Sequence, residues 1–119
     1  MPLDHERLDV YQIALRFHDA AHAIAARVPR GEGDLADQLR RASNSVLLNI
    51  AEGAGRMSRA EKRRFYVIAR GSVNECGALL DAVRPLGIVD EAKSRAHKED
   101  LVRMFQMLVK LAKVMERKR

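Results

Sequence analysis

Apolar residues recur along this chain at alternating intervals of four and three positions, which is the spacing of one face of an α-helix. The pattern occurs four times, and glycine, proline or a capping residue separates each occurrence from the next. The sequence therefore predicts helices at about residues 6–28, 35–54, 59–84 and 91–116. The core-facing stripe of the first helix consists of Val10, Ala14, Phe17, Ala21, Ile24 and Val28.

The ends of these helices carry their own signals. Ser58 followed by Glu61 fits a capping box, in which each side chain satisfies a backbone amide of the other residue. Asp34 and Asp90 are expected to cap the second and fourth helices, and Gly55 is expected to end the second helix in a left-handed conformation. Four long helices with short connections predict an all-α, antiparallel up-down-up-down four-helix bundle, with residues 1–119 as a single domain.

Two of the helices carry more apolar positions than one core-facing stripe needs. The additional positions are Leu8, Tyr11 and Leu15 on the first helix and Val102, Met107, Val109 and Val114 on the fourth. A wide core face explains them. A subunit interface explains them equally well, because monomers seldom expose large apolar patches. The pattern alone leaves both interpretations open.

A row of polar residues accompanies the apolar stripe of the second helix, and polar residues also interrupt the third. A buried carboxylate is costly unless it is paired, so Glu52 and Glu75 are expected to meet Arg56, Arg70 or backbone donors. A paired-carboxylate acid/base site would use the same residues, but no nucleophile or set of metal ligands accompanies them. We expect instead a structural polar network made of Ser45, Asn49, Glu52, Arg70, Ser72 and Glu75.

Other residues that could carry chemistry are better explained structurally. His18 and His22 have the spacing of a zinc-protease helix, but Asp19 replaces the catalytic Glu and no third ligand follows. They are therefore expected at the rim of the core, without a metal. Cys76 lies on an apolar stripe and is expected to be inert. Since Gly-Ala-Gly at residues 53–55 follows a helix, it does not fit a phosphate loop. The sequence predicts a protein that is not an enzyme and needs no cofactor.

The charge of the chain is uneven and basic. Lys and Arg number 22 against 16 Asp and Glu, which gives a net charge of +6. The densest cluster is Arg56, Arg59, Lys62, Arg63 and Arg64; Arg40 and Arg41 are weaker candidates, and Arg117, Lys118 and Arg119 form a basic tail. Five basic residues within nine positions exceed what solubility requires. A solvated basic face is one interpretation, and binding to the phosphate backbone of RNA or DNA is the other.

The sequence shows no sign of a membrane or of secretion. No apolar run approaches the ~18 residues of a membrane span, and the first eight residues lack an apolar secretory segment. A single cysteine excludes an intrachain disulfide. The expected compartment is the cytoplasm.

Three segments, in order along the chain, resemble motifs of the bacterial four helix bundle family, also called 23S rRNA-intervening-sequence proteins. Leu-Asp-Val-Tyr-Gln-Ile-Ala at residues 8–14 resembles the opening motif. Arg-Arg-Ala at 40–42, followed by Asn-Ile-Ala-Glu-Gly-Ala-Gly-Arg at 49–56, is similar to the central signature. The third-helix motif is matched by Phe65, Ala69, Arg70, Gly71, Ser72 and Glu75.

The chain departs from the family pattern at Leu47, where members often carry proline. Proline would remove a backbone donor and bend the helix, so Leu47 leaves the second helix free to be straighter.

The resemblance implies a fold more than a function, because most members have no established activity. Some are encoded within insertions in large-subunit ribosomal RNA genes. Distant relatives, the accessory variability proteins of diversity-generating retroelements, form homopentamers with a basic surface and associate with a reverse transcriptase and nucleic acid. By this analogy we expect a homo-oligomer, a pentamer, that binds RNA or DNA without sequence specificity. The alternative is an adaptor for a protein partner such as a reverse transcriptase.

Overall fold

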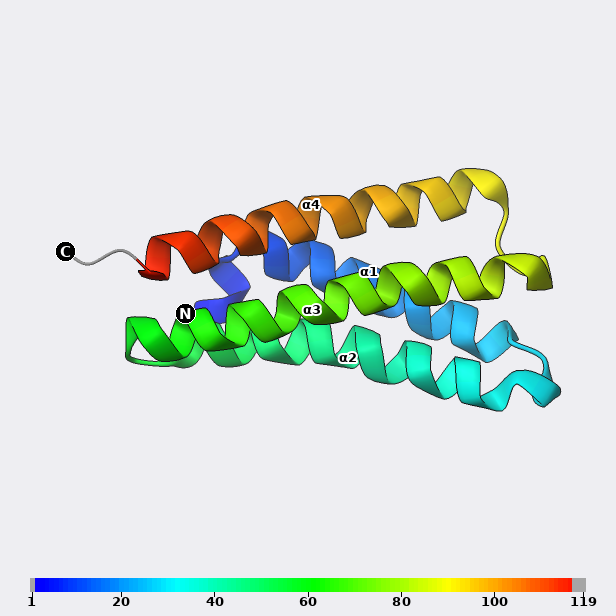
Figure 1. Cartoon of the computed structure of the whole chain (residues 1–119), viewed down its shortest axis with the longest axis horizontal. Helices are drawn as coiled ribbons and strands as arrows, with labels where there is room; N and C mark the ends of the chain where they lie inside the picture. Colours follow the sequence, from blue (N-terminus) through cyan, green and yellow to red (C-terminus); the bar gives the residue numbers. More distant parts are fainter. Residues whose placement is uncertain (1, 117–119) are drawn as a thin grey trace.

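Four long helices run antiparallel to their neighbours in the computed structural model, which describes residues 2–116 (Figure 1). They are α1 (Asp9–Arg27), α2 (Gly33–Gly55), α3 (Arg59–Val83) and α4 (Glu91–Glu116). Short 3-10 turns accompany them as η1 (Asp4–Arg7), η2 (Arg30–Glu32) and η3 (Arg84–Leu86). The predicted all-α, up-down-up-down four-helix bundle is confirmed. Helices that follow one another in the chain pack closely, whereas α1 and α4 pack together least of the neighbouring pairs.

Two of the predicted helix caps are confirmed. The Ser58 hydroxyl oxygen accepts a hydrogen bond from the Glu61 amide at 3.1 Å, at the start of α3, which is one of the two bonds of the predicted capping box. The Asp90 carboxylate accepts one from the Lys93 amide at 2.8 Å, immediately before α4. Each bond satisfies a backbone donor that the helix itself leaves without a partner.

Two other predicted ends are wrong. Asp34 does not cap α2, because the helix already begins at Gly33 and places Asp34 within its first turn. A negative charge there still favours the helix through its dipole. Gly55 is not left-handed: within residues 2–116 the one glycine with a positive φ is Gly87, at +68°, where the chain turns from η3 toward α4. The first helix also begins later than predicted, since Asp4–Arg7 form the separate turn η1.

The inward face of α3 follows helical spacing through the buried Ala69, Ser72, Cys76, Leu79 and Val83, and departs from the predicted stripe only at its first residue. The spacing of these apolar positions along the sequence predicts Phe65 as the first core residue of the helix, but Phe65 is half-buried and the neighbouring Tyr66 is the buried aromatic, with 3% of its surface exposed. Gly53 on α2 accounts for the difference. A Cβ added at Gly53 would lie 2.9 Å from the Tyr66 ring and 3.1 Å from the Phe65 Cβ. The absence of a side chain therefore lets α2 approach α3 and cover the Tyr66 ring.

The additional apolar rows of α1 and α4 are only partly covered. Leu15, Val102 and Val114 are exposed, while Leu8, Tyr11, Met107 and Val109 are half-buried. A groove of about 340 Å³ lies between the two helices, lined by Leu8, Asp9, Val10, Met107, Lys110, Leu111 and Val114. None of the helices within residues 2–116 combines the length and the apolar character needed to cross a bilayer.

Candidate functional site

The densest basic cluster of the sequence surrounds the junction of α2 and α3. We call Arg56, Arg59, Lys62, Arg63 and Arg64 the basic corner. The α2–α3 junction lies at the same end of the bundle as the last turn of α4 (Figure 1). The corner thus brings together cationic side chains and the carboxyl-terminal ends of two helices, α2 and α4.

Three residues of the basic corner contact these helix ends. The Lys62 ammonium donates to the carbonyl oxygens of Gly53 at 3.3 Å and Ala54 at 2.8 Å, in the last turn of α2. The Arg59 guanidinium donates to the Val114 carbonyl oxygen at 2.9 Å, and Arg63 lies 3.7 Å from the Glu116 carboxylate. Cations are favourable at helix carboxyl-termini, where carbonyl groups lack partners. These contacts give Arg59, Lys62 and Arg63 a structural role that the charge pattern alone does not indicate.

The remaining two residues stack on one aromatic ring. The guanidinium carbons of Arg56 and Arg64 lie 4.8 and 4.9 Å from the centroid of the Phe65 ring, within cation–π range. Arg56 also pairs with Glu52 at 2.6 Å, and its other terminal nitrogen is 3.9 Å from Glu61. Arg64 is exposed and makes no hydrogen bond or ion pair with other residues in the 2–116 range. Phe65 therefore contacts two positively charged side chains, each within 5 Å of its ring centroid.

The electrostatic balance of the corner is positive but modest. Five cationic side chains face three carboxylates, those of Glu52, Glu61 and Glu116. The Nε atoms of Arg56 and Arg63 are buried without a hydrogen-bond partner in the described part of the chain. The Arg64 guanidinium is exposed and open to an anion, and Arg59 is exposed with one hydrogen bond, whereas both terminal nitrogens of Arg56 lie near carboxylates.

The other predicted basic residues do not join this corner. Arg40 pairs with Asp37 at 3.3 Å on the same helix, and Arg41 is exposed. Arg40 precedes Arg56 by 16 positions on α2, a separation of about 24 Å along the helix axis. The basic tail of Arg117, Lys118 and Arg119 lies outside the described residues. The structure therefore divides the predicted phosphate-binding set into separate parts.

Half of the predicted polar network forms between α2 and α3. The hydroxyl groups of Ser45 and Ser72 are 2.7 Å apart, and the Asn49 side-chain amide donates to the Ser45 carbonyl oxygen at 2.8 Å and its hydroxyl at 3.1 Å. Ser72 is buried and the other two are half-buried. These bonds satisfy polar groups that the packed helices would otherwise leave without partners.

The other three members of the predicted network lie elsewhere. Glu52 is exposed and pairs with Arg56, as expected, but at the surface rather than inside. Glu75 is also exposed, and Arg70 lies over the Phe105 ring at 6.0 Å, on the α3–α4 side. The expectation of an internal network of six residues is therefore corrected. Glu52 and Glu75 lie on parts of α2 and α3 that face the solvent. Each carboxylate therefore stays hydrated and does not need a buried partner.

The sulfur of Cys76 is fully buried, as its place on the apolar stripe predicts. Burial raises the pKa of the Cys76 thiol to about 12, with the nearby charge of Glu75 adding to the effect. Because the thiolate is the nucleophilic form, this cysteine is unreactive in the folded chain. No three His, Cys, Asp or Glu side chains gather closely enough to hold a metal ion anywhere from residue 2 to residue 116.

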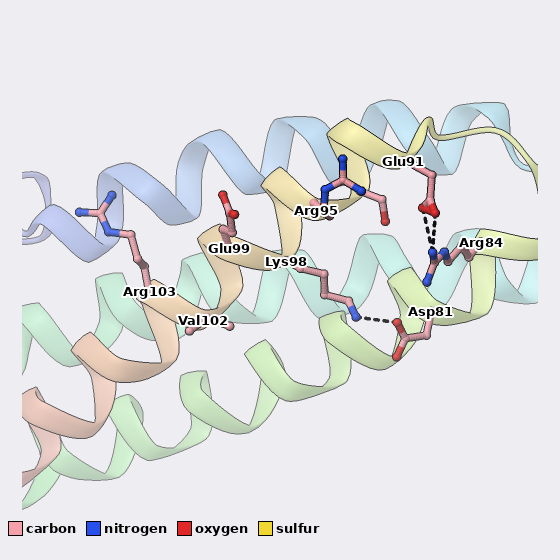
Figure 2. A pocket seen from close by; sticks show the side chains of 9 residues that line it. Asp81, Arg84, Glu91, Arg95, Lys98, Glu99, Val102 and Arg103 are labelled. Carbon is pink, nitrogen blue, oxygen red and sulfur yellow. Dashed lines mark hydrogen bonds and ion pairs between the residues drawn. The ribbon is translucent and has the colours of Figure 1, made fainter.

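Sequence reasoning missed a groove of about 580 Å³ between the end of α3 and the start of α4 (Figure 2). Arg84 pairs with Glu91 at 2.6 Å, and Lys98 pairs with Asp81 at 2.6 Å. Arg95, Glu99, Val102 and Arg103 complete its lining together with Ser94. Charges of both signs are interspersed here, so no charge run or motif in the sequence indicated the groove.

Comparisons with known proteins agree with this architecture. A protein of unknown function from the S23 ribosomal protein family of Bacteroides thetaiotaomicron, known from a crystal structure, superposes with a TM-score of 0.78. The superposition covers 87% of this chain and 95% of that one at 19% sequence identity, which supports the fold alone. No curated protein sequence matches the chain. Residues 6–110 match the family described as 23S rRNA-intervening sequence protein. With that match spanning most of its length, the chain belongs to the 23S rRNA-intervening sequence protein family.

Proposed function

We propose that this protein is a non-enzymatic, self-associating four-helix bundle that binds the phosphate backbone of RNA or DNA through its basic corner, with little sequence preference. The observation that carries the proposal is the pair of guanidinium groups, Arg56 and Arg64, stacked on Phe65 at the surface. A stacked guanidinium already has restricted conformational freedom, so a phosphate group meets a partly ordered partner.

Self-association is the second element of the proposal. The net charge of a single basic corner is small, and one corner on its own would bind a polyanion weakly. Several copies in one assembly would present the corner repeatedly and bind with avidity. The exposed Leu15, Val102 and Val114, with the apolar groove between α1 and α4, supply a surface for such assembly. A ring of five subunits is the form that the family resemblance favours.

The non-enzymatic part of the proposal rests on the carboxylates. Glu52 is held in an ion pair with Arg56, and Glu75 stands exposed on α3. Neither residue lines the groove between α3 and α4 or the groove between α1 and α4. The buried Cys76 cannot act as a nucleophile. A general acid or base needs a positioned substrate pocket around it.

The test is the light-scattering mass of the protein on a sizing column, with and without a short RNA, at low and high salt. A mass of several subunits that takes up RNA at low salt and releases it at high salt would support the proposal. An assembly that ignores RNA at both salt concentrations would contradict nucleic-acid binding, and a monomer would contradict self-association.

A charge-matched pair of variants makes the test specific to the basic corner. Arg64→Glu and Arg95→Glu change the net charge equally, but Arg95 lies at the opposite end of the bundle, in the groove of Figure 2. Arg64→Glu should weaken RNA binding and lower the slope of log K against log salt by about one, because Arg64 no longer neutralises a phosphate. Equal effects of the two substitutions would show that only the overall charge matters.

A second candidate function is an adaptor for a nucleic-acid enzyme. The groove of Figure 2 favours it, because its interspersed charges and the exposed Val102 suit a protein surface better than a uniform polyanion. This function predicts weak binding to free nucleic acid even at low salt. Capture of a purified reverse transcriptase by the wild-type chain, and its failure in Val102→Glu, would distinguish the two functions.

A further inference from the structure

Two histidines of α1 converge on one side chain of α2. The Nε2 atom of His18 lies 2.9 Å from the side-chain oxygen of Asn44, and the Nε2 atom of His22 lies 3.0 Å from the same oxygen. The two imidazole rings are neighbours, with centroids 4.2 Å apart. All three side chains are half-buried between α1 and α2, away from the basic corner. Two ring nitrogens and one amide oxygen thus face a common point.

We propose that His18, His22 and Asn44 form a binding site for a divalent transition-metal cation of the Ni²⁺ or Cu²⁺ type. Histidines four residues apart on a helix present their rings to the same side and can bind one ion together. The amide oxygen of Asn44, from the neighbouring helix, supplies the third ligand, and water would complete the coordination. The proposal is independent of nucleic-acid binding.

The distances favour a particular coordination geometry. Two ligand atoms that are each about 2.0–2.1 Å from a metal and at right angles to one another are about 2.9 Å apart. The two nitrogen–oxygen distances, 2.9 and 3.0 Å, match this arrangement. Right-angled nitrogen and oxygen ligands are typical of tetragonal Cu²⁺ and Ni²⁺ sites, whereas tetrahedral zinc requires wider angles. Both nitrogen–oxygen pairs are therefore close enough for each pair to bind one ion together.

The carboxylate of Asp19 suits the tautomer of His18 that a metal requires. Its Nδ1 atom lies 3.1 Å from the Asp19 carboxylate, which can accept the Nδ1 proton. With the proton on Nδ1, a cation bound to Nε2 would take the place of the proton that Nε2 otherwise donates to the Asn44 oxygen. A carboxylate behind a ligating histidine also fixes the ring orientation and increases the basicity of the ligand. Asp19, which the sequence pattern counted against a catalytic zinc site, therefore fits a positioning role in a binding site.

The experiment uses the untagged full chain and follows NiCl₂ binding by titration calorimetry and by the melting temperature. We expect saturable binding of one Ni²⁺ per chain and a rise in melting temperature of at least about 5 °C at a hundredfold excess over Kd. His22→Gln should weaken binding by about tenfold or more. His97→Gln, at a histidine that packs against Phe17 instead, is the matched control and should leave binding unchanged.

A further variant tests the role of Asn44 and does not depend on removing a ligand. Asn44→Asp replaces the amide oxygen by a charged carboxylate oxygen and should tighten Ni²⁺ binding. Absence of binding in the wild-type chain, or equal binding in wild type and His22→Gln, would overturn the proposed site. Binding that Asn44→Asp leaves unchanged or weakens would overturn the role of Asn44.

Discussion

Gly53 leaves no room for a side chain between α2 and α3, so replacing it by alanine is a direct test of the packing described above. Elsewhere in a helix this change is favourable, because alanine has a higher helix propensity than glycine by about 1 kcal/mol. At Gly53 the new Cβ would lie 2.9 Å from one ring carbon of Tyr66, 3.1 Å from another, and 3.1 Å from the Phe65 Cβ. The two effects oppose one another.

The packing cost should exceed the gain in propensity. The Tyr66 ring is buried and has no free volume to move into, and the Phe65 Cβ is attached directly to the backbone of α3. Forcing a methyl group into such a site costs about 1–3 kcal/mol. After subtraction of the propensity gain of about 1 kcal/mol, we expect Gly53→Ala to lower the free energy of unfolding by about 0–2 kcal/mol.

Gly71→Ala is the matched control. Gly71 lies in the middle of α3, is exposed, and has no atom within 4 Å of an added Cβ. The same substitution should therefore stabilise the chain by about 0.5–1 kcal/mol. Urea unfolding followed by circular dichroism, at one fixed protein concentration, measures both changes as shifts in midpoint with an unchanged slope. If Gly53→Ala stabilised the chain as much as Gly71→Ala does, the inferred tight contact with Tyr66 would be refuted.

Three further predictions concern buried polar groups. The Cys76 thiol, whose pKa burial raises to about 12, should react with a thiol reagent at neutral pH only as fast as the chain unfolds; rapid labelling under native conditions would contradict its burial. Burial lowers the pKa of His97 below its ordinary 6.5, so the unfolded chain takes up this proton first as the pH falls. The contribution of neutral His97 to the free energy of unfolding is therefore complete above pH 6.5 and diminishes below it. Urea unfolding should show that His97→Gln loses less stability than the wild type between about pH 7 and 5. Ser72→Ala should lower the free energy of unfolding by about 0.5–1.5 kcal/mol, because the Ser45 hydroxyl loses one hydrogen-bond partner. The double variant Ser45→Ala/Ser72→Ala should lower it by less than the sum of the two single changes.

The fold could be predicted from the sequence because its dominant signal is local. On α1 the predicted stripe from Val10 to Ile24 is buried at every position, since apolar and polar residues alternate clearly there. On α3 the same spacing identifies the buried face from Ala69 to Val83 but not its first aromatic residue, because residues 65–68 are four consecutive apolar side chains. Periodicity cannot decide which of them faces inward. The decision is made by Gly53, a residue on another helix that contributes no side chain at all.

The candidate site was predictable in its charges but not in its contacts. The density of arginine and lysine at the basic corner is visible in the sequence, whereas the hydrogen bond from Arg59 to Val114 joins residues 55 positions apart. Likewise, the spacing of His18 and His22 is a sequence feature, but the oxygen on which they converge belongs to Asn44, on the next helix. Contacts of this kind depend on the relative rotation and height of two helices, which no single-helix pattern contains.

The interface between α1 and α4, which we call the α1–α4 seam, is the least closely packed of the four between neighbouring helices, and this affects how the bundle opens. Contacts between consecutive helices join segments close in the chain, but this seam joins its first and last helices, as in the ion pair of Arg16 with Asp100, 84 residues away. Bringing α1 against α4 has the largest loop-closure entropy cost of the neighbouring helix pairs and gains the least packing. Backbone amides of α1 and α4 should therefore exchange with deuterium through partial opening, while the α2–α3 hairpin stays protected until the whole chain unfolds. A second copy of the chain bound in the groove between α1 and α4 would hold these two helices together. Assembly would then lengthen the time for which the bundle stays closed.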